Sequence, residues 1–302
     1  MSIDYEALGR VICIANGKGG VNKTSIVANV GGLAAAGNYR TLLVDLDPQG
    51  DLSDDLGYYS NPTDDHGQQL ATALLTGAPL APTLTSVRPG LDVITGGEHL
   101  TDVVGGLVAR ASRGASTTNL LAAALAPLAG TYDLVLIDTP PVDVTLQAMA
   151  LGAARWLLVP TRADASSIRG IRRIAERLHD TRSEHLIDLL GVVLTGVPVA
   201  ARRVRADAAR DIQAMLGTAA PLFASTIRSS DAVARTTRDE GILVHELAER
   251  VEGAAPFWQA LRSGGTPQRV PGSAPALADD YVRLTEEILK RLAELEAQEG
   301  AA

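Results

Sequence analysis

The chain has 302 residues, enough for one large α/β domain or two smaller ones. Its 46% hydrophobic and 21% charged residues are typical of a soluble globular protein. Its net charge of −8 is unusual for a protein that binds DNA. Neither a leader-like apolar start nor a long uncharged apolar stretch is present, so we expect no signal peptide and no transmembrane helix. The single cysteine, Cys13, excludes an intrachain disulfide and favours a reducing cytoplasm.

Short apolar runs alternate with helical patterns along the chain. The expected strands are 10–15, 41–46, 91–95, 133–138, 156–160, 189–195 and the less regular 220–226. Helical patterns include 23–36, which Gly37 ends, and 167–179. Several strands are apolar on both faces, as parallel strands covered by helices are. The alternation therefore predicts an α/β fold with a doubly wound, mostly parallel sheet flanked by helices.

A glycine-rich loop, NGKGGVNKTS at residues 16–25, separates the first strand from the first helix. This is the strand–loop–helix context of a phosphate-binding loop, and it makes the sheet a candidate P-loop NTPase fold. Backbone N–H groups and the helix N-terminus can bind phosphate oxygens there. Lys23 is expected to bridge the β- and γ-phosphates, and the Thr24 hydroxyl to bind Mg²⁺. The predicted nucleotide-binding residues of the loop are Gly17, Lys18, Gly19, Gly20, Val21, Asn22, Lys23, Thr24 and Ser25.

Two features of this loop are unusual. Asn22 stands where such loops commonly have a glycine in the left-handed backbone region, which asparagine tolerates better than other side chains. We therefore expect a slightly strained but working loop, the alternative being a degenerate one. Only three of the 27 basic residues are lysines, and Lys18 and Lys23 are two of them. A compact ammonium suits a phosphate oxygen in a tight loop.

Acidic residues follow two of the expected strands. In LLVDLDPQGDL, Asp45 ends a strand and Asp47 lies just beyond it, where it could orient an attacking water; alternatively, both belong to a solvated turn. In YDLVLIDTPP, Asp138 ends a buried strand, where nucleotidases keep an acid that helps to hold Mg²⁺; alternatively, it caps the next turn. The predicted metal-binding residues are Thr24, Asp47 and Asp138.

The segments KGGVNKTS, DLDPQG and LVLIDTPP, at this spacing, resemble the deviant Walker A ATPases of the ParA/MinD family. The resemblance covers about residues 10–250 and is closest to the ParA-type DNA-partition ATPases. It implies ATP and Mg²⁺ as cofactors. It also implies that Lys18 is the signature lysine that reaches the partner's ATP across a dimer, that Asp47 is the catalytic acid and that Asp138 is the Walker B acid. Lys18, Lys23 and Asp47 are the expected catalytic residues.

The resemblance extends to residues 225–247, which match the region near the adenine and the DNA face. It places Arg228 at the ATP site, at a position where the family often has a proline. Asp51 stands where the family often has an asparagine after DPQG. We therefore expect the adenine contacts and the switch behaviour of this chain to differ from the family pattern.

The arginines are concentrated in one part of the chain. Residues 155–238 contain 14 arginines against 8 acids, a local net charge of +6. Such a region could follow DNA phosphates without reading sequence. The alternative is a solvated helix face paired with nearby acids. The predicted DNA-binding residues are Arg202, Arg203, Arg205, Arg235 and Arg238.

The C-terminal part divides into a linker and a helix. Residues 263–276 are rich in Gly, Pro and Ser and read as a linker after an ATPase domain of residues 1–262. Residues 277–302 carry an amphipathic helix with an apolar stripe, which we expect to pack on its own domain or on a neighbouring subunit. Residues 279–299 hold seven acids and three bases, which disfavours membrane targeting.

The leading hypothesis is a ParA-like ATPase of the cytoplasm, associated with the nucleoid. It would dimerise on ATP, bind DNA nonspecifically and segregate a plasmid, phage or chromosome together with a ParB-like centromere-binding partner. We expect slow turnover until a partner stimulates it. The alternatives are an ATP-dependent filament and a MinD-like positioning ATPase. An iron–sulfur ATPase is rejected, because the single cysteine lies in the first strand.

Overall fold

The computed structural model describes residues 3–114, 116–164, 166–167, 170–174, 176, 187–197, 201–216, 222–253 and 271–299. Its described strands form one eight-stranded sheet in the order β3-β4-β2-β5-β1-β6-β7-β8. β3 pairs antiparallel with β4, and every other neighbouring pair is parallel. The bounds are β1 Val11–Ile14, β2 Thr41–Asp45, β3 Leu84–Arg88, β4 Leu91–Ile94, β5 Leu134–Asp138, β6 Trp156–Arg162, β7 Asp188–Thr195 and β8 Leu222–Ile227.

The predicted fold class is confirmed, with one strand that the sequence analysis missed. All seven expected strands are present within a residue or two of their predicted ends. The missed strand is β3, an edge strand in which only Leu84 is buried. It therefore lacks the continuous apolar run by which the central strands are recognised.

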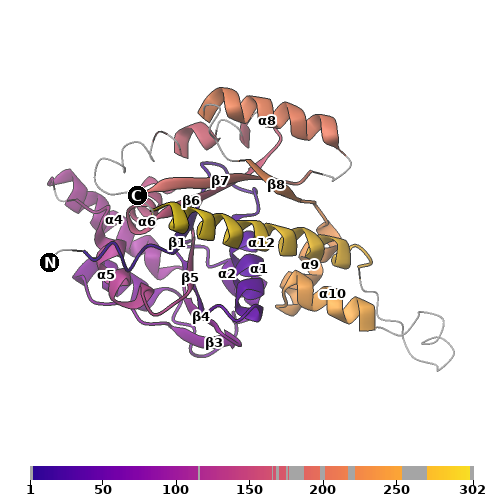
Figure 1. The fold of residues 1–302 in the computed structure, drawn as a ribbon. Coiled ribbons are helices and arrows are strands. Elements are labelled where there is room, and N and C mark those ends of the chain that lie inside the picture. Colours follow the sequence, from indigo (N-terminus) through magenta and orange to yellow (C-terminus); the bar gives the residue numbers. More distant parts are fainter. Residues whose placement is uncertain are drawn as a thin grey trace.

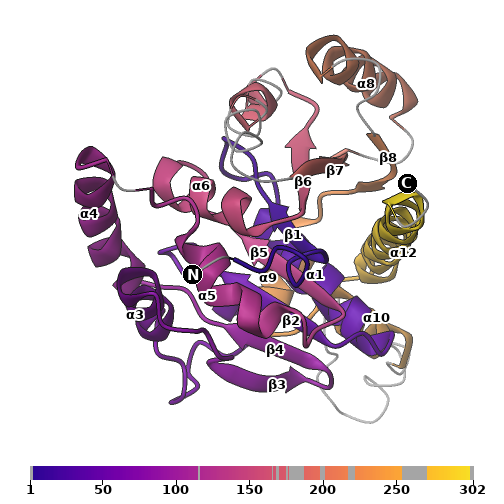
Figure 2. The same cartoon turned by 60° about the vertical axis from the view of Figure 1, so that its left-hand side comes forward.

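Helices cover both faces of this sheet (Figures 1 and 2). On one face lie α3 (Gln68–Thr76), α4 (His99–Ser112), α5 (Leu120–Ala129), α6 (Val144–Ala153) and α8 (Arg202–Leu216). On the other lie α1 (Lys23–Ala36), α2 (Leu52–Leu56), α9 (Asp231–Glu240), α10 (Val244–Gly253) and α12 (Ala274–Glu299). The predicted helix 23–36 is α1, residue for residue. The predicted helix 167–179 is helical at 167, 170–174 and 176, and its other residues lie outside the described ones.

Successive residues of the central strands feed two separate cores. Val11 and Cys13 of β1 belong to the core on the α5 and α6 side, and Ile12 and Ile14 to the core on the α1 side. Because side chains alternate across a strand, a strand covered on both faces must be apolar throughout. All four β1 side chains are buried, which explains the unbroken apolar run.

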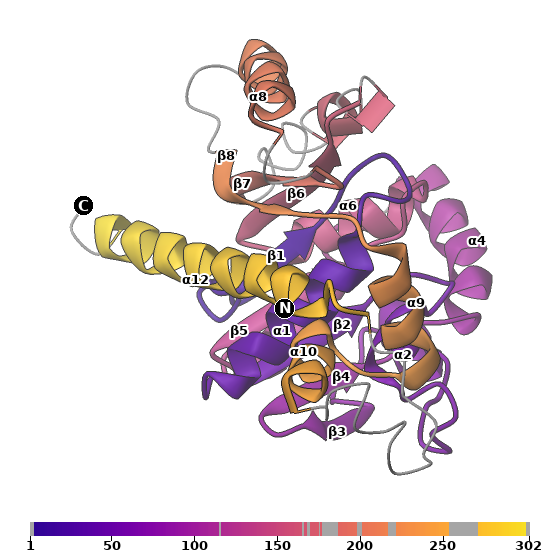
Figure 3. The ribbon, with the colours of Figure 1, turned by 90° about the vertical axis from the view of Figure 1, so that its right-hand side faces the viewer.

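Helix α12 lies against the body of the same chain, across α1, α10 and β8 (Figure 3). It begins at Ala274, three residues before the predicted start. Its predicted stripe is buried at Leu277, Tyr281, Leu284, Ile288 and Leu292 and partly buried at Leu295. The leucine stripe therefore packs on its own domain rather than facing solvent. Most of the predicted linker lies outside the described residues, so the domain boundaries stay a prediction. No helix in the described ranges combines the length and apolar character needed to cross a membrane.

Candidate active site

The loop between β1 and α1 has an unusual backbone that fits its sequence. Asn22 lies in the left-handed region, at φ 66° and ψ 30°, directly before the first helical residue, Lys23. Gly20 also has a positive φ, of 72°. The expected left-handed Asn22 is thus present, and its side chain makes no capping hydrogen bond to the helix. Asparagine is therefore suited to this position because it tolerates the left-handed backbone conformation, and not because its side chain caps the helix.

A buried asparagine that the sequence analysis missed holds the start of the loop through two hydrogen bonds. Asn16 Nδ2 donates to the carbonyl of Pro160 at 2.7 Å, and its Oδ1 accepts the backbone N–H of Lys18 at 3.0 Å. A Cβ at Gly170 would lie 2.2 Å from this Oδ1, so only glycine fits there. The brace ties the loop to β6. Its only sequence signal is a polar residue directly after a buried strand.

Two aspartates end neighbouring parallel strands and lie side by side. Asp45 of β2 and Asp138 of β5 are partners in the strand register, and both are fully buried. One oxygen of each accepts a backbone N–H at 2.9 Å, from Asp47 and from Thr139 respectively. Among the residues that the structure describes, the Oδ2 atom of each has no hydrogen-bond partner. Burial raises the pKa of Asp138 to about 7 and that of Asp45 well above its usual value, and the neighbouring Asp138 carboxyl raises the latter further.

The amine of Lys23 lies within electrostatic reach of Asp138 and Asp47. The Lys23 residue is only 7% exposed, and burial lowers the pKa of its amine, while Asp138 and Asp47 act in the opposite direction. Buried oxygens without partners are rare unless a ligand completes them. Mg²⁺ is usually held by one or two carboxylates together with phosphates and water. Thr24, Asp47 and Asp138 fit that donor set. Within the described ranges no group of three or more His, Cys, Asp or Glu could hold a metal by itself.

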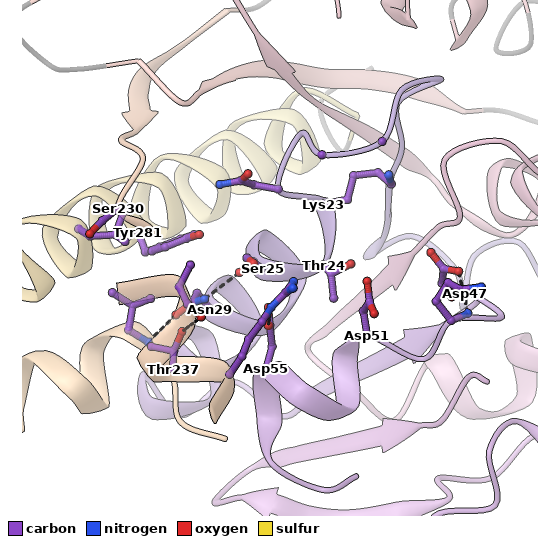
Figure 4. A pocket seen from close by; sticks show the side chains of 18 of the residues that line it. Lys23, Thr24, Ser25, Asn29, Asp47, Asp51, Asp55, Ser230, Thr237 and Tyr281 are labelled. Atoms are coloured by element: carbon purple, nitrogen blue, oxygen red, sulfur yellow. Dashed lines mark hydrogen bonds and ion pairs between the residues drawn. The ribbon is translucent and has the colours of Figure 1, made fainter. Parts of the chain in front are cut away.

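A cavity of about 440 Å³ opens above this loop. Figure 4 places Lys23, Thr24 and Asp47 toward one end and Ser230 and Tyr281 toward the other. Of the predicted ATP-binding residues, seven line it: Gly19, Gly20, Asn22, Lys23, Thr24, Ser25 and Arg228. The other three, Gly17, Lys18 and Val21, are not among its lining residues. The lining also includes Asn29, Asp51, Asp55, Ile242, Val244 and Leu277, which the sequence analysis did not assign to the site.

Lys18 is held by its own chain. Its Nζ lies 3.0 Å and 3.3 Å from the two oxygens of Asp164 and 3.1 Å from Ser167 Oγ. Hydrogen bonds, above all from the Ser166 hydroxyl and also from Lys18, lower the pKa of Asp164. Within this chain, Lys18 therefore forms an ion pair with a carboxylate beside the loop. Its role toward the ATP of a partner subunit stays a prediction.

The arginines predicted to bind DNA are spread over different parts of the fold. Arg203 on α8 and Arg235 on α9 are exposed, while Arg205 donates to the carbonyl of Ala224 at 2.6 Å. Arg238 donates to Asp55 at 2.8 Å and lines the cavity. The side chain of Arg202 lies outside the described ones. Figures 1 and 3 place α8 and α9 far apart, so one protomer does not join these side chains into a single patch.

Comparison with known proteins supports the nucleotide-binding interpretation of this geometry. The AAA domain family (AAA_31) matches residues 9–189. The chromosome partitioning protein ParA of Myxococcus xanthus is 35% identical over 188 residues, which make up 62% of this chain and 60% of that protein. The chain thus aligns with less than two thirds of that relative's length.

Two solved structures have the same fold. The ATP complex of a McdA variant from Cyanothece has a TM-score of 0.69 and 20% identity, with 93% of this chain and 96% of that chain covered. The cobyrinic acid a,c-diamide synthase of Mycobacterium smegmatis, with a bound ATP analogue and magnesium, has a TM-score of 0.61 and 27% identity, with 86% and 99% covered. The ligands of this second structure agree with the predicted ATP and Mg²⁺. On the family match, the partition-protein similarity and the shared fold, the chain belongs to the ParA/MinD family of deviant Walker A ATPases.

Proposed function

We propose that the chain is a partition ATPase of the ParA type, which hydrolyses ATP with Mg²⁺ and uses the nucleotide to control its own assembly on DNA. The observation that carries the proposal is the ready phosphate-binding end of the cavity. Asn22 is already left-handed, and Lys23 is already buried where the charges of Asp138 and Asp47 act on its amine. A site that is formed before its ligand arrives loses little binding free energy to reorganisation.

The chemistry follows from the charges around the loop. The backbone N–H groups at the start of α1 and the Lys23 ammonium would bind the phosphates. Thr24, Asp47 and Asp138 would hold Mg²⁺, which would neutralise charge on the phosphate oxygens. Asp47, 7% exposed in the cavity wall, would orient the attacking water. We expect slow turnover, since the segment that carries Asp47 must hold this geometry during the reaction.

The proposal extends to a homodimer that contains ATP. Lys18 lies beside the loop but pairs with Asp164 instead of facing its own cavity. The phosphates of ATP bound to a second subunit would offer Lys18 a more concentrated negative charge than one carboxylate does. ATP would then join two subunits, and hydrolysis would weaken the contact. The exposed Val142 and Val144, 78% and 57% exposed, follow the Asp138 strand and could be covered by the second subunit.

Nonspecific DNA binding is the proposed output of this dimer. Arg203 and Arg235 are exposed, and the two-fold repetition of a dimer would present each of them twice. A ParB-like partner that stimulates hydrolysis would reset the cycle, in the cytoplasm and at the nucleoid. An ATP-dependent filament uses the same site and is the second candidate. A MinD-like positioning ATPase is the third.

Fluorescence anisotropy with a random-sequence duplex tests the proposed output. ATP should support tight, salt-sensitive binding and ADP should not, since log affinity falls linearly with log salt when phosphates are neutralised. Replacing Arg202, Arg203 and Arg205 together by Glu should abolish the ATP-dependent signal while leaving ATP binding intact. Equal DNA binding by this variant and the wild type would refute the assignment of DNA binding to the arginines of α8. No DNA binding in either nucleotide state would favour the filament, which light scattering with ATP would detect.

A further inference from the structure

Helix α12 contributes to the wall of the nucleotide cavity. Leu277 and Tyr281 line it together with Ile242 and Val244. Figure 4 places Tyr281 at the end away from Asp47. The helix belongs to residues 274–299, far beyond the 9–189 stretch that matches the AAA domain family. A segment at the end of the chain therefore completes a cavity whose phosphate end is built from the beginning of the chain.

An ion pair with a buried carboxylate fixes this helix to the rest of the cavity wall. Asp280 is 2% exposed, and its two oxygens accept Arg228 Nε at 2.6 Å and Arg228 Nη2 at 2.9 Å. The Arg228 backbone N–H also donates to Asp280, at 3.1 Å. A second contact joins the same two segments, where the hydroxyls of Ser230 and Ser273 are 2.8 Å apart. Since Arg228 and Ser230 both line the cavity, the same contacts hold α12 in place and shape the pocket.

The helix is also attached to the edge of the sheet. Glu287 accepts the backbone N–H groups of Ala224 and Ser225 on β8, at 2.7 and 2.9 Å. These edge-strand groups would otherwise lack a strand partner. The hydrogen bonds to Glu287 fix the position of α12 along its own axis, and therefore also the position of Tyr281 in the cavity wall.

Tyr281 brings a hydroxyl without a partner among the described residues to the wall of the cavity. The residue is 3% exposed, and its hydroxyl makes no hydrogen bond in the part of the chain that the structure describes. Figure 4 shows its ring pointing into the cavity. The hydroxyl oxygen is not sealed off like the fully buried unpaired oxygens of Asp45 and Asp138, so a ligand in the cavity can reach it. A ligand in the cavity would supply that partner.

We propose that α12 is the nucleoside-binding wall of the ATP site, where the Tyr281 hydroxyl hydrogen-bonds the nucleoside part of the nucleotide. The apolar surface of Leu277, Ile242 and Val244 suits the face of a purine ring, and a tyrosine hydroxyl can donate to a ring nitrogen or accept from an amine. Asp280 and Arg228 are positioning residues in this arrangement, since they hold the helix that carries Tyr281. The inference deepens the proposed ATP binding and rests on it.

A coupling follows from this geometry. If the nucleoside contacts α12, binding must stabilise the docked helix, and undocking of the helix must weaken binding by the same factor. The C-terminal helix would then respond to occupancy of a site whose reaction takes place at its other end.

Calorimetric titration with two probes separates the two ends of the site. ADP would contact both ends, whereas inorganic tripolyphosphate would contact only the phosphate end. Tyr281→Phe removes one hydroxyl without changing the packing, and we expect ADP to bind it about 5-fold more weakly while tripolyphosphate binds unchanged. Tyr39→Phe is the matched control, because Tyr39 is partly buried in the same core but does not line the cavity. It should bind both ligands like the wild type.

Each outcome distinguishes this inference from the function on which it rests. A wild-type protein that binds neither ADP nor ATPγS refutes the proposed nucleotide site as a whole. A wild-type protein that binds ADP, with Tyr281→Phe within 2-fold of it, refutes the nucleoside wall alone. An equal loss of ADP and tripolyphosphate affinity in Tyr281→Phe also refutes it, since the effect would then be on the whole fold.

Hydrogen exchange provides a second measurement, and its first comparison uses only the wild type. ADP should slow amide exchange in residues 274–285 of the wild type, and tripolyphosphate should not. Asp280→Asn should raise exchange in the same segment and weaken ADP binding, while Asp279→Asn, one position away and exposed, should do neither. Equal exchange of 274–285 with and without ADP would overturn the coupling.

Discussion

The left-handed backbone of Asn22 makes a prediction that separates strain from binding. Asn22→Ala keeps a Cβ and removes the side chain that tolerates this region, so holding φ near 66° costs about 1 kcal/mol more than in the wild type. The cost must appear in one of two ways. If the surrounding fold holds the loop, the free energy of unfolding falls. If the loop relaxes instead, nucleotide affinity falls.

The size of each effect follows from that cost. About 1 kcal/mol lowers the melting temperature by roughly 2–4 °C in a domain of this size class. The same free energy, when it is needed to restore the loop at binding, weakens ATPγS about 5-fold, since the competent fraction of molecules falls. Asn22→Gly removes the strain but adds freedom to the unfolded chain, so we expect it to stay within about 1 kcal/mol of the wild type.

The assay is thermal melting without nucleotide together with calorimetric titration of ATPγS. Asn38→Ala is the matched control, because Asn38 has φ 67° but is exposed, just after α1, and does not line the cavity. It should lose stability and leave affinity unchanged. If Asn22→Ala has wild-type stability and wild-type affinity, the backbone argument is wrong.

Three further predictions concern the dimer, the backbone packing and the acid response. Lys18→Gln should still bind ATP but lose ATP-dependent dimerisation, as measured by multi-angle light scattering. Gly241→Ala should lower the melting temperature by several degrees, because its Cβ would lie 2.2 Å from the Cα of Gly57 at a positive φ of 62°. Burial alone would raise the pKa of Glu246, but hydrogen bonds from Arg88 and from a backbone N–H lower it overall. This contribution to stability is present at neutral pH and is lost as the pH falls below the ordinary glutamate value toward the lowered one, so the difference between wild type and Glu246→Gln in urea unfolding should shrink there.

Each of these has a control or a contrary outcome. If Lys18→Gln still forms ATP-dependent dimers, the proposal that Lys18 binds the ATP of the partner subunit is wrong. Gly105→Ala, at a helical glycine whose Cβ would meet nothing within 4 Å, should be neutral or stabilising by up to about 1 kcal/mol. A Gly241→Ala protein that melts like Gly105→Ala would contradict the close approach to Gly57. A constant difference between Glu246→Gln and wild type from pH 7 to pH 3 would contradict the lowered pKa.

Local patterns in the sequence determined the nucleotide-binding end of this protein. The apolar runs identify the parallel strands because most of these strands are buried on both faces, whereas the edge strand β8, in which Ala224 is exposed, has the least regular pattern. The limits of α1 follow from the loop before it and from Gly37 after it. The left-handed Asn22 follows from the conformations available to one residue, and no distant contact is needed to predict it. The ParA/MinD resemblance rests on these same contiguous segments.

Contacts between distant segments decided the rest. The side-by-side carboxyls of Asp45 and Asp138 depend on the order and register of β2 and β5. The pairing of Lys18 with Asp164 joins residues 146 positions apart, and Arg228 meets Asp280 across 52. The sequence analysis predicted an apolar stripe on this helix, and Tyr281 lies on it, but periodicity states only which face of a helix is buried and not what it is buried against. Only the packing of α12 against α1, α10 and β8 brings Tyr281 to the nucleotide cavity.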